Sequence, residues 1–166
     1  MCKGGSLVKI TVLAVGNLIR SDEGAGLHAL RLLAARRLPP GVELVEGGTD
    51  GLSLLPVFRE SDAVIVVDAV LAGDEPGSLY RFPPEAVRAG RLPERLSPHQ
   101  VGIFDVLGTA RLLGSLPATV IIGVQPGVLD WGTELSPAVA GALPRLADLV
   151  MTEIKSLAGE PEVNRP

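Results

Sequence analysis

The feature that most constrains the fold is a run of five apolar residues, AVIVV at positions 63–67, followed directly by Asp68. A strand with no polar face belongs where both faces of a sheet are covered, which is the usual place of a central strand in a parallel sheet. Residues 9–15 and 119–124 have the same short, β-branched and apolar character. The chain therefore has at least three strands that need cover on both sides.

Segments with helical spacing alternate with these strands. Apolar residues recur at helical spacing from about Glu23 until a proline pair ends the pattern, and Ser97-Pro98-His99-Gln100 forms a capping box with proline at the first helical position of a second helix. The remaining expected elements are a strand at 42–45, a short helix at 52–58, an edge strand at 79–82 and a last helix within 136–157. The proline-rich residues 83–93 show no regular pattern, and we expect them at the surface.

Alternating strands and helices predict an α/β fold with three layers, in which a mostly parallel twisted sheet is covered by helices on both faces. The strand at 79–82 could add an antiparallel edge. Hydrophobic residues make up 46% of the chain and aromatic residues only 3%, so the core has to be built from aliphatic side chains packed between layers. The length of 166 residues and the even composition predict one domain over residues 1–166.

Several classes of function are disfavoured. The net charge is −4 and the arginines are scattered among acidic residues, so no basic stripe is available for nucleic acid. The longest apolar runs are far shorter than the roughly 20 residues of a membrane span, and we expect a cytoplasmic protein without a membrane partner. The single cysteine, Cys2, excludes disulfide frameworks and thiolate zinc sites. Signatures of serine hydrolases, zincins and phosphate-binding loops are missing.

Three ligand-type side chains fall at the ends of predicted elements. In parallel sheets ligands collect beyond the carboxyl ends of the strands, where Asp68 follows a strand and Glu23 follows the loop after another. His99 begins a helix, a position that favours the neutral imidazole to which metals bind. Each residue also has a structural interpretation: Glu23 as a first-turn acid beside a capping Asp22, Asp68 as a turn cap, and His99 as a surface histidine. Together they would make a nitrogen and oxygen site suited to nickel or zinc.

The order of short motifs along the chain resembles the hydrogenase maturation endopeptidases. The motifs are Gly16-Asn17, Asp22-Glu23-Gly24-Ala25-Gly26, Glu46-Gly47-Gly48-Thr49, Asp68-Ala69 and Ser97-Pro98-His99-Gln100. The similarity extends from about residue 9 to residue 157. One departure is Glu46, where the family often has aspartate.

The resemblance implies an endopeptidase that removes the C-terminal extension of a nickel-iron hydrogenase large-subunit precursor after nickel insertion. It implies Glu23, Asp68 and His99 as catalytic residues and nickel ligands, with nickel delivered inside the substrate. The substrate contacts that it implies are Asn17, Gly48, Thr49 and Gln100. Two alternatives stay open at this point: a non-catalytic nickel-sensing or precursor-holding protein that uses the same ligands, and a nucleotide-binding α/β domain.

Overall fold

The sheet at the centre of the molecule places its strands in the order β2-β1-β3-β5-β4. The computed structural model describes residues 7–88 and 98–159 of the chain. The strands are β1 (Ile10–Val15), β2 (Val42–Gly48), β3 (Ala63–Ala69), β4 (Leu79–Phe82) and β5 (Ala118–Val124). All neighbouring strands run parallel except β4, which pairs antiparallel with β5 at the edge.

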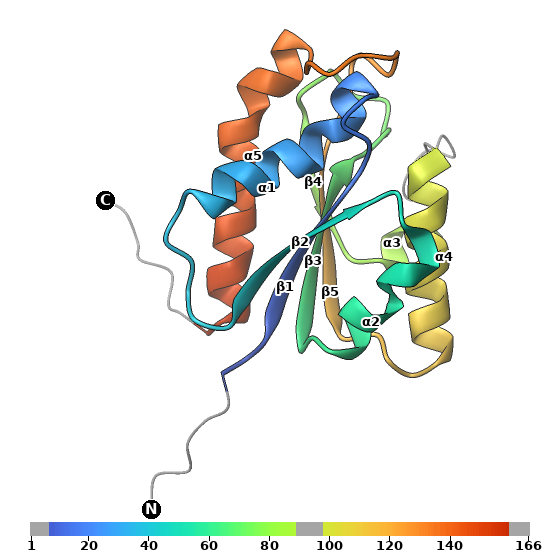
Figure 1. Ribbon diagram of the computed structural model, residues 1–166, viewed down its shortest axis with the longest axis vertical. Helices are drawn as coiled ribbons and strands as arrows, with labels where there is room; N and C mark the ends of the chain where they lie inside the picture. The colour runs from blue at the N-terminus through green and yellow to red at the C-terminus, as the bar shows by residue number, and fades with distance from the viewer. Residues whose placement is uncertain (1–6, 89–97, 160–166) are drawn as a thin grey trace, which may run out of the picture.

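Helices cover the sheet on both faces, as Figure 1 shows. The helices are α1 (Ala25–Ala34), α2 (Leu55–Arg59), α3 (Glu85–Arg88), α4 (Pro98–Leu112) and α5 (Pro137–Leu157). Two 3-10 turns, η1 (Ser21–Gly24) and η2 (Gly51–Leu54), precede α1 and α2. The pair α1 and α5 covers one face, and α2 and α4 cover the other.

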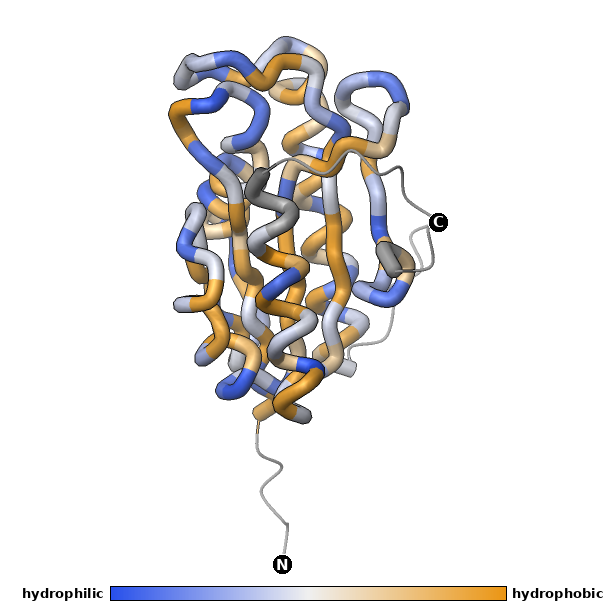
Figure 2. The backbone as a smooth tube through the Cα atoms, turned by 90° about the vertical axis from the view of Figure 1, so that its right-hand side faces the viewer, coloured by the Kyte–Doolittle hydropathy of each residue, from blue (hydrophilic) through white to orange (hydrophobic). Residues whose placement is uncertain are grey.

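The alternation of side chains along β3 explains why this strand has no polar face. Ile65 and Val67 pack into the aliphatic cluster beneath α1 and α5, while Val64 and Val66 pack into the second cluster beneath α2 and α4. All seven residues of β3 are buried. In Figure 2, long hydrophobic stretches run along the strands. The predicted three-layer, mostly parallel fold is confirmed.

Most predicted elements are found within a few residues, and the differences have local causes. β2 extends through Gly47-Gly48 because Gly48 still pairs with Val15 after the register shifts by one residue at Gly47. A short helix, α3, was not foreseen in the proline-rich segment, where Pro83 is exposed; residues 89–97 lie outside the described part of the chain. No helix in the described part is long and apolar enough to cross a membrane.

The strand order creates a crevice for a site. The chain leaves β1 through α1 on one face to reach β2, and it returns through α2 on the opposite face to reach β3, which lies on the other side of β1. Loops that leave neighbouring strands toward opposite faces open a crevice at the carboxyl edge of a parallel sheet. The segments at this point are η1, after β1, and Asp68, near the end of β3.

Candidate active site

Glu23 is held against the ends of two strands by close backbone packing. Gly26, at the start of α1, lies so near the strand ends that an added Cβ would be 2.4 Å from the carbonyl oxygen of Val67. Gly16 has φ +134°, and a Cβ there would be 2.0 Å from the carbonyl oxygen of Glu23. Only glycine fits such approaches. Gly16, after β1, and Gly26, in α1, therefore bring the backbone of Glu23 onto the sheet edge beside β3.

The turn that carries Glu23 is fixed by a loop distant in sequence. Ser21 has φ +46°, the only positive φ of a non-glycine residue in the described chain. A left-handed serine costs on the order of 1 kcal/mol and persists only where its surroundings hold it. Its amide donates to the carbonyl of Gly132 at 2.8 Å, and its hydroxyl donates to the carbonyl of Asp130 at 3.0 Å. The loop between β5 and α5 thus determines the path of η1.

Asp22 makes the strongest of these connections. Its side chain is fully buried, and it accepts hydrogen bonds from the amides of Gly127 and Val128 at 2.8 Å and from the amide of Ser136 at 2.7 Å. The hydroxyl of Ser136 donates a fourth bond at 2.8 Å. The interpretation of Asp22 as a local cap is wrong: no side chain caps η1 or α1, and this carboxylate instead binds the loop that leads into α5.

Asp68 is close enough to Glu23 to feel its charge, and it is almost entirely shielded from solvent. It is 3% exposed and Glu23 is 2% exposed. Burial raises the pKa of Asp68 well above its usual range, and the charge of Glu23 raises it further, although a hydrogen bond from the amide of Ala69 at 2.7 Å favours the ionised form. Two like charges in a dry crevice favour either a proton or a cation between them.

Arg20 approaches the carboxylate of Glu23 from the solvent side. Its Nη2 lies 3.6 Å from Oε1 of Glu23, and its guanidinium lies over the ring of Trp131, with 5.1 Å between Cζ and the ring centroid. Neither Arg20 nor Trp131 was recognised from the sequence. The one available signal was the position of the single tryptophan, which follows a predicted strand without belonging to a helical or strand pattern.

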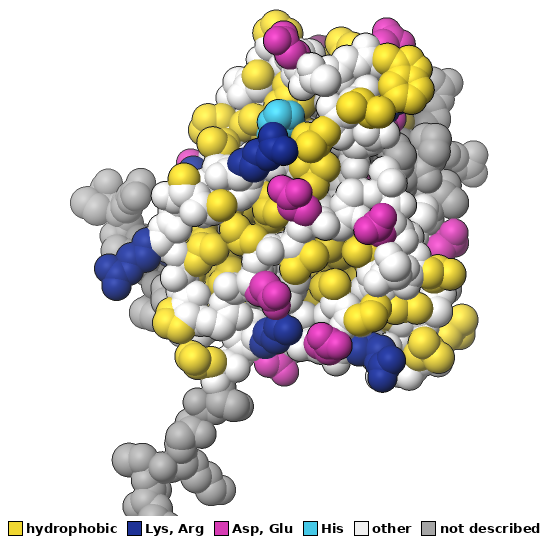
Figure 3. All heavy atoms as spheres, in the orientation of Figure 1, with side chains coloured by type: hydrophobic (Ala, Val, Ile, Leu, Met, Phe, Trp, Pro, Cys, Tyr) yellow, Lys and Arg dark blue, Asp and Glu magenta, His cyan; other side chains and the backbone are white. Residues whose placement is uncertain are grey.

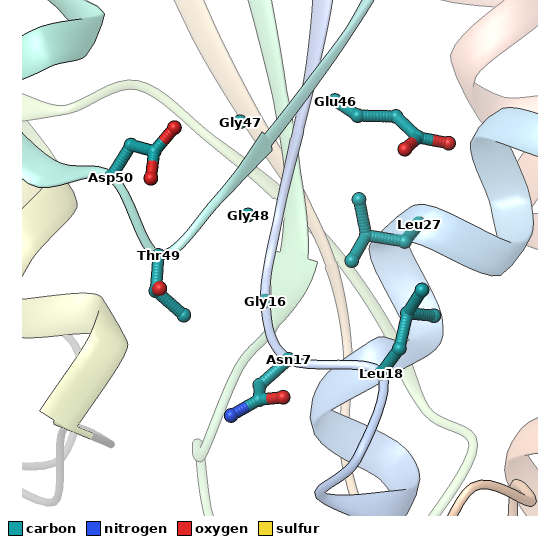
Figure 4. A pocket seen from close by; sticks show the side chains of 9 residues that line it. All are labelled: Gly16, Asn17, Leu18, Leu27, Glu46, Gly47, Gly48, Thr49 and Asp50. Atoms are coloured by element: carbon teal, nitrogen blue, oxygen red, sulfur yellow. The ribbon is translucent and has the colours of Figure 1, made fainter.

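A pocket opens beside these residues at the ends of β1 and β2. It has a volume of about 320 Å³ and is lined by residues 16–18, Leu27 and residues 46–50. In Figure 4, Glu46, Leu27 and Leu18 lie on one side, Thr49 and Asp50 on the other, and Gly16 and Gly48 between them. Residues of the loops after β1 and β2 thus border one pocket, whereas Asp68 is not among the residues that line it. Of the predicted substrate contacts, Asn17, Gly48 and Thr49 line this pocket.

The first turn of α4 carries His99 and Gln100, whose side chains lie outside the described residues. Further along α4, Gly102 and Ile103 line a second, smaller pocket together with Gly48 and Thr49. The N-terminal part of α4 therefore lies at the same edge of the sheet as the main pocket. Among the described side chains no group of three histidines, cysteines or carboxylates could hold a metal ion, so Glu23 and Asp68 form at most part of a metal site.

Comparison with known proteins decides the family. A family model described as hydrogenase maturation protease matches residues 27–153. The chain is 42% identical to the hydrogenase expression/formation protein HupD of Rhodobacter capsulatus, over 81% of this chain and 66% of that protein. It is 32% identical to the hydrogenase 2 maturation protease of Escherichia coli, over 89% of this chain and 92% of that protein.

The chain belongs to the hydrogenase maturation proteases. The solved structure of the maturating endopeptidase HybD from Escherichia coli aligns with a TM-score of 0.81 at 31% identity, covering 90% of this chain and 93% of that one. HybD from Thermococcus kodakarensis aligns with a TM-score of 0.75 at 27% identity, covering 89% and 100%. The expected family, the fold and the expectation of a hydrolase are confirmed.

The family match begins at Leu27, after Glu23 in the chain. Asp68 and His99 lie within the matched residues, but the match assigns no role to single residues, so the roles of Glu23, Asp68 and His99 as ligands and catalytic residues stay predictions. For Glu23 and Asp68 they rest on the buried carboxylate pair and the neighbouring pocket, and for His99 on the placement of its helix.

Proposed function

We propose that this protease removes the C-terminal extension of a nickel-iron hydrogenase large-subunit precursor in the cytoplasm, after nickel has been inserted, and that it recognises the nickel held by the precursor. The observation that carries the proposal is the pair of buried carboxylates, Glu23 and Asp68, at the crevice beside an open pocket. Together with a histidine from α4, this pair has the donor chemistry that suits nickel or zinc.

The pair of carboxylates is better suited to a metal ion that arrives with the substrate than to one that the protease holds permanently. Glu23 and Asp68 are buried and repel each other, and a divalent ion placed between them would remove that repulsion. Two carboxylates and one imidazole leave coordination positions open, which a metal already bound in the substrate can fill with substrate ligands. A divalent ion near a scissile bond can polarise its carbonyl or lower the pKa of a bound water.

The pocket supports binding of an extended peptide. Its floor contains the glycines at positions 47 and 48, where no side chain hides the backbone, and Asn17 and Thr49 add an amide and a hydroxyl at its border. Backbone groups with a few polar side chains are the usual partners of an extended chain. We assign the segment next to the cleavage point to this pocket and the metal to the crevice beside it.

Cleavage of a purified precursor tests the proposal. Nickel-loaded and nickel-free precursor are incubated with the wild type and with Glu23→Gln, Asp68→Asn and His99→Ala, and the products are weighed by mass spectrometry. We expect one C-terminal peptide from loaded precursor only, and losses of a hundredfold or more, roughly, in each variant. The matched controls Asp105→Asn, at an exposed position of α4, and His28→Ala, on α1, should cleave at the wild-type rate.

The same experiment separates the enzyme from a nickel-sensing or precursor-holding protein. Such a protein would form a nickel-dependent complex with the precursor and release no peptide. Cleavage that proceeds equally with nickel-free precursor would refute metal recognition and leave only the protease activity.

A further inference from the structure

Arg20 is a cation already placed where a metal would approach Glu23. The carboxylate of Glu23 is nearly inaccessible, whereas the side chain of Arg20 is about a third exposed, so the guanidinium lies between the buried acid and the solvent. Their separation of 3.6 Å is that of an ion pair. A second cation at Glu23 would be repelled by this guanidinium unless Arg20 moved away.

Trp131 keeps Arg20 in this position. The indole is 72% exposed, and the structure places it against the guanidinium. Backbone contacts hold the two segments that carry these side chains side by side. Arg20 forms a β-bridge with Gly132, and the amide of Gly132 donates to the carbonyl of Ile19 at 3.0 Å. A stacked guanidinium can slide on an aromatic face without losing the contact entirely.

The surroundings of the pair are apolar and face the solvent. Ile19 is 53% exposed and Val128 is 41% exposed. Their two loops are joined by hydrogen bonds from the amides of residues 21 and 22 to the carbonyls of Gly132 and Val128. Figure 3 shows hydrophobic side chains gathered at the top of the molecule, where Figure 1 places the loop between β5 and α5. A large partner that covers this rim would exclude water from the Arg20–Glu23 pair, whereas a hydrated free ion would not.

We propose that Arg20 is a specificity-determining residue that competes with divalent cations for Glu23, so that the site accepts nickel presented by a docked precursor and rejects free metal. The inference rests on the proposed function above. A precursor delivers its nickel at the high effective concentration of an intramolecular contact, which can displace the guanidinium from Glu23 while it stays stacked on the face of Trp131. Free nickel at low concentration has no such advantage. Arg20 thereby adds selectivity for loaded substrate.

The test measures binding of free nickel as well as cleavage. Nickel chloride is titrated calorimetrically into the wild type, Arg20→Met, Trp131→Ala and the control Arg36→Met, which removes an ion pair with Asp148 far along the chain. Methionine keeps an unbranched apolar stem and removes the charge. We expect Arg20→Met to bind free nickel about fivefold more tightly, as for the loss of one competing ion pair, and Trp131→Ala to show a smaller increase. Arg36→Met should match the wild type.

Free nickel should also inhibit cleavage of loaded precursor at about fivefold lower concentration in Arg20→Met than in the wild type. Equal nickel affinity in the wild type, Arg20→Met and Trp131→Ala would overturn the inference while leaving cleavage, and with it the proposed function, intact. A wild type that releases no peptide from loaded precursor would instead refute the proposed function. If Arg20→Met fails to fold, Trp131→Ala decides: its side chain is exposed, and an unchanged nickel affinity overturns the inference.

Discussion

Replacing Asp22 by asparagine should destabilise the protein strongly although the side chain keeps its shape. The carboxylate of Asp22 accepts four hydrogen bonds, three at Oδ2 and one at Oδ1. Asparagine has one acceptor oxygen and one amide group that only donates. With its oxygen in the place of Oδ2, the amide nitrogen would face the N–H of Ser136 at the 2.7 Å separation now occupied by Oδ1. The opposite orientation would set the amide against two backbone donors and is worse.

The expected loss of stability follows from these bonds. The best orientation loses one charge-assisted bond and leaves a buried donor unsatisfied, which costs about 1–3 kcal/mol. The three remaining bonds become neutral, and neutral bonds are roughly half as strong as bonds to a carboxylate. We expect a loss of about 3 kcal/mol in the free energy of unfolding. For a chain of this length that corresponds to a fall in Tm of about 6–12 °C.

Urea denaturation of Asp22→Asn and the wild type measures this loss as a shift in midpoint at constant slope. The matched control is Asp148→Asn, which breaks an ion pair with Arg36 at a side chain that is 69% exposed. An exposed pair of this kind contributes less than about 1 kcal/mol. A change below about 1 kcal/mol for Asp22→Asn would show that the four bonds do not fix the turn that carries Glu23, and would refute the reasoning.

Two further predictions concern the crevice. Because burial raises the pKa of Asp68, its contribution to stability is present in the protonated form, below the ordinary carboxyl pKa, and is lost as pH rises through the raised pKa. The free energy of unfolding of the wild type should therefore fall relative to Asp68→Asn as pH rises above the ordinary carboxyl pKa, and a difference independent of pH would contradict this. Gly26→Ala should cost about 3 kcal/mol or more and slow cleavage, because its Cβ meets the backbone of Val67; wild-type stability would show that α1 shifts freely.

The sequence predicted the fold well because its strongest signals are local. The run at 63–67 has no polar face, and the structure places it in the middle of the sheet with both faces covered. The strand at 79–82 was expected as a possible antiparallel edge and is found with those bounds. The capping box at residues 97–100 correctly placed the start of α4 at Pro98. These elements depend on spacing and proline position, which a single sequence displays.

The surroundings of the site could not be predicted in the same way, because they depend on contacts across the chain. Asp22 was interpreted as a local cap, since an acid before a helix usually is one. Its partners are more than 100 residues away, in the loop between β5 and α5. The stacking of Arg20 on Trp131 has the same cause. No periodicity links residues at such distances, so the structure was needed to find them.

The charges of the crevice explain why cleavage and metal insertion would be coupled in such an enzyme. Without a metal, Asp68 is buried beside Glu23 and resists ionisation, while the charge of Glu23 is met by Arg20. Arg20 is therefore a cation that an incoming metal ion would have to displace from Glu23. Under the proposed function, a nickel ion carried by the precursor would supply the charge that lets Asp68 ionise and Arg20 move aside, and we expect the productive arrangement to form only with loaded substrate. Discrimination between loaded and empty precursor would then follow from electrostatics at Glu23, Asp68 and Arg20.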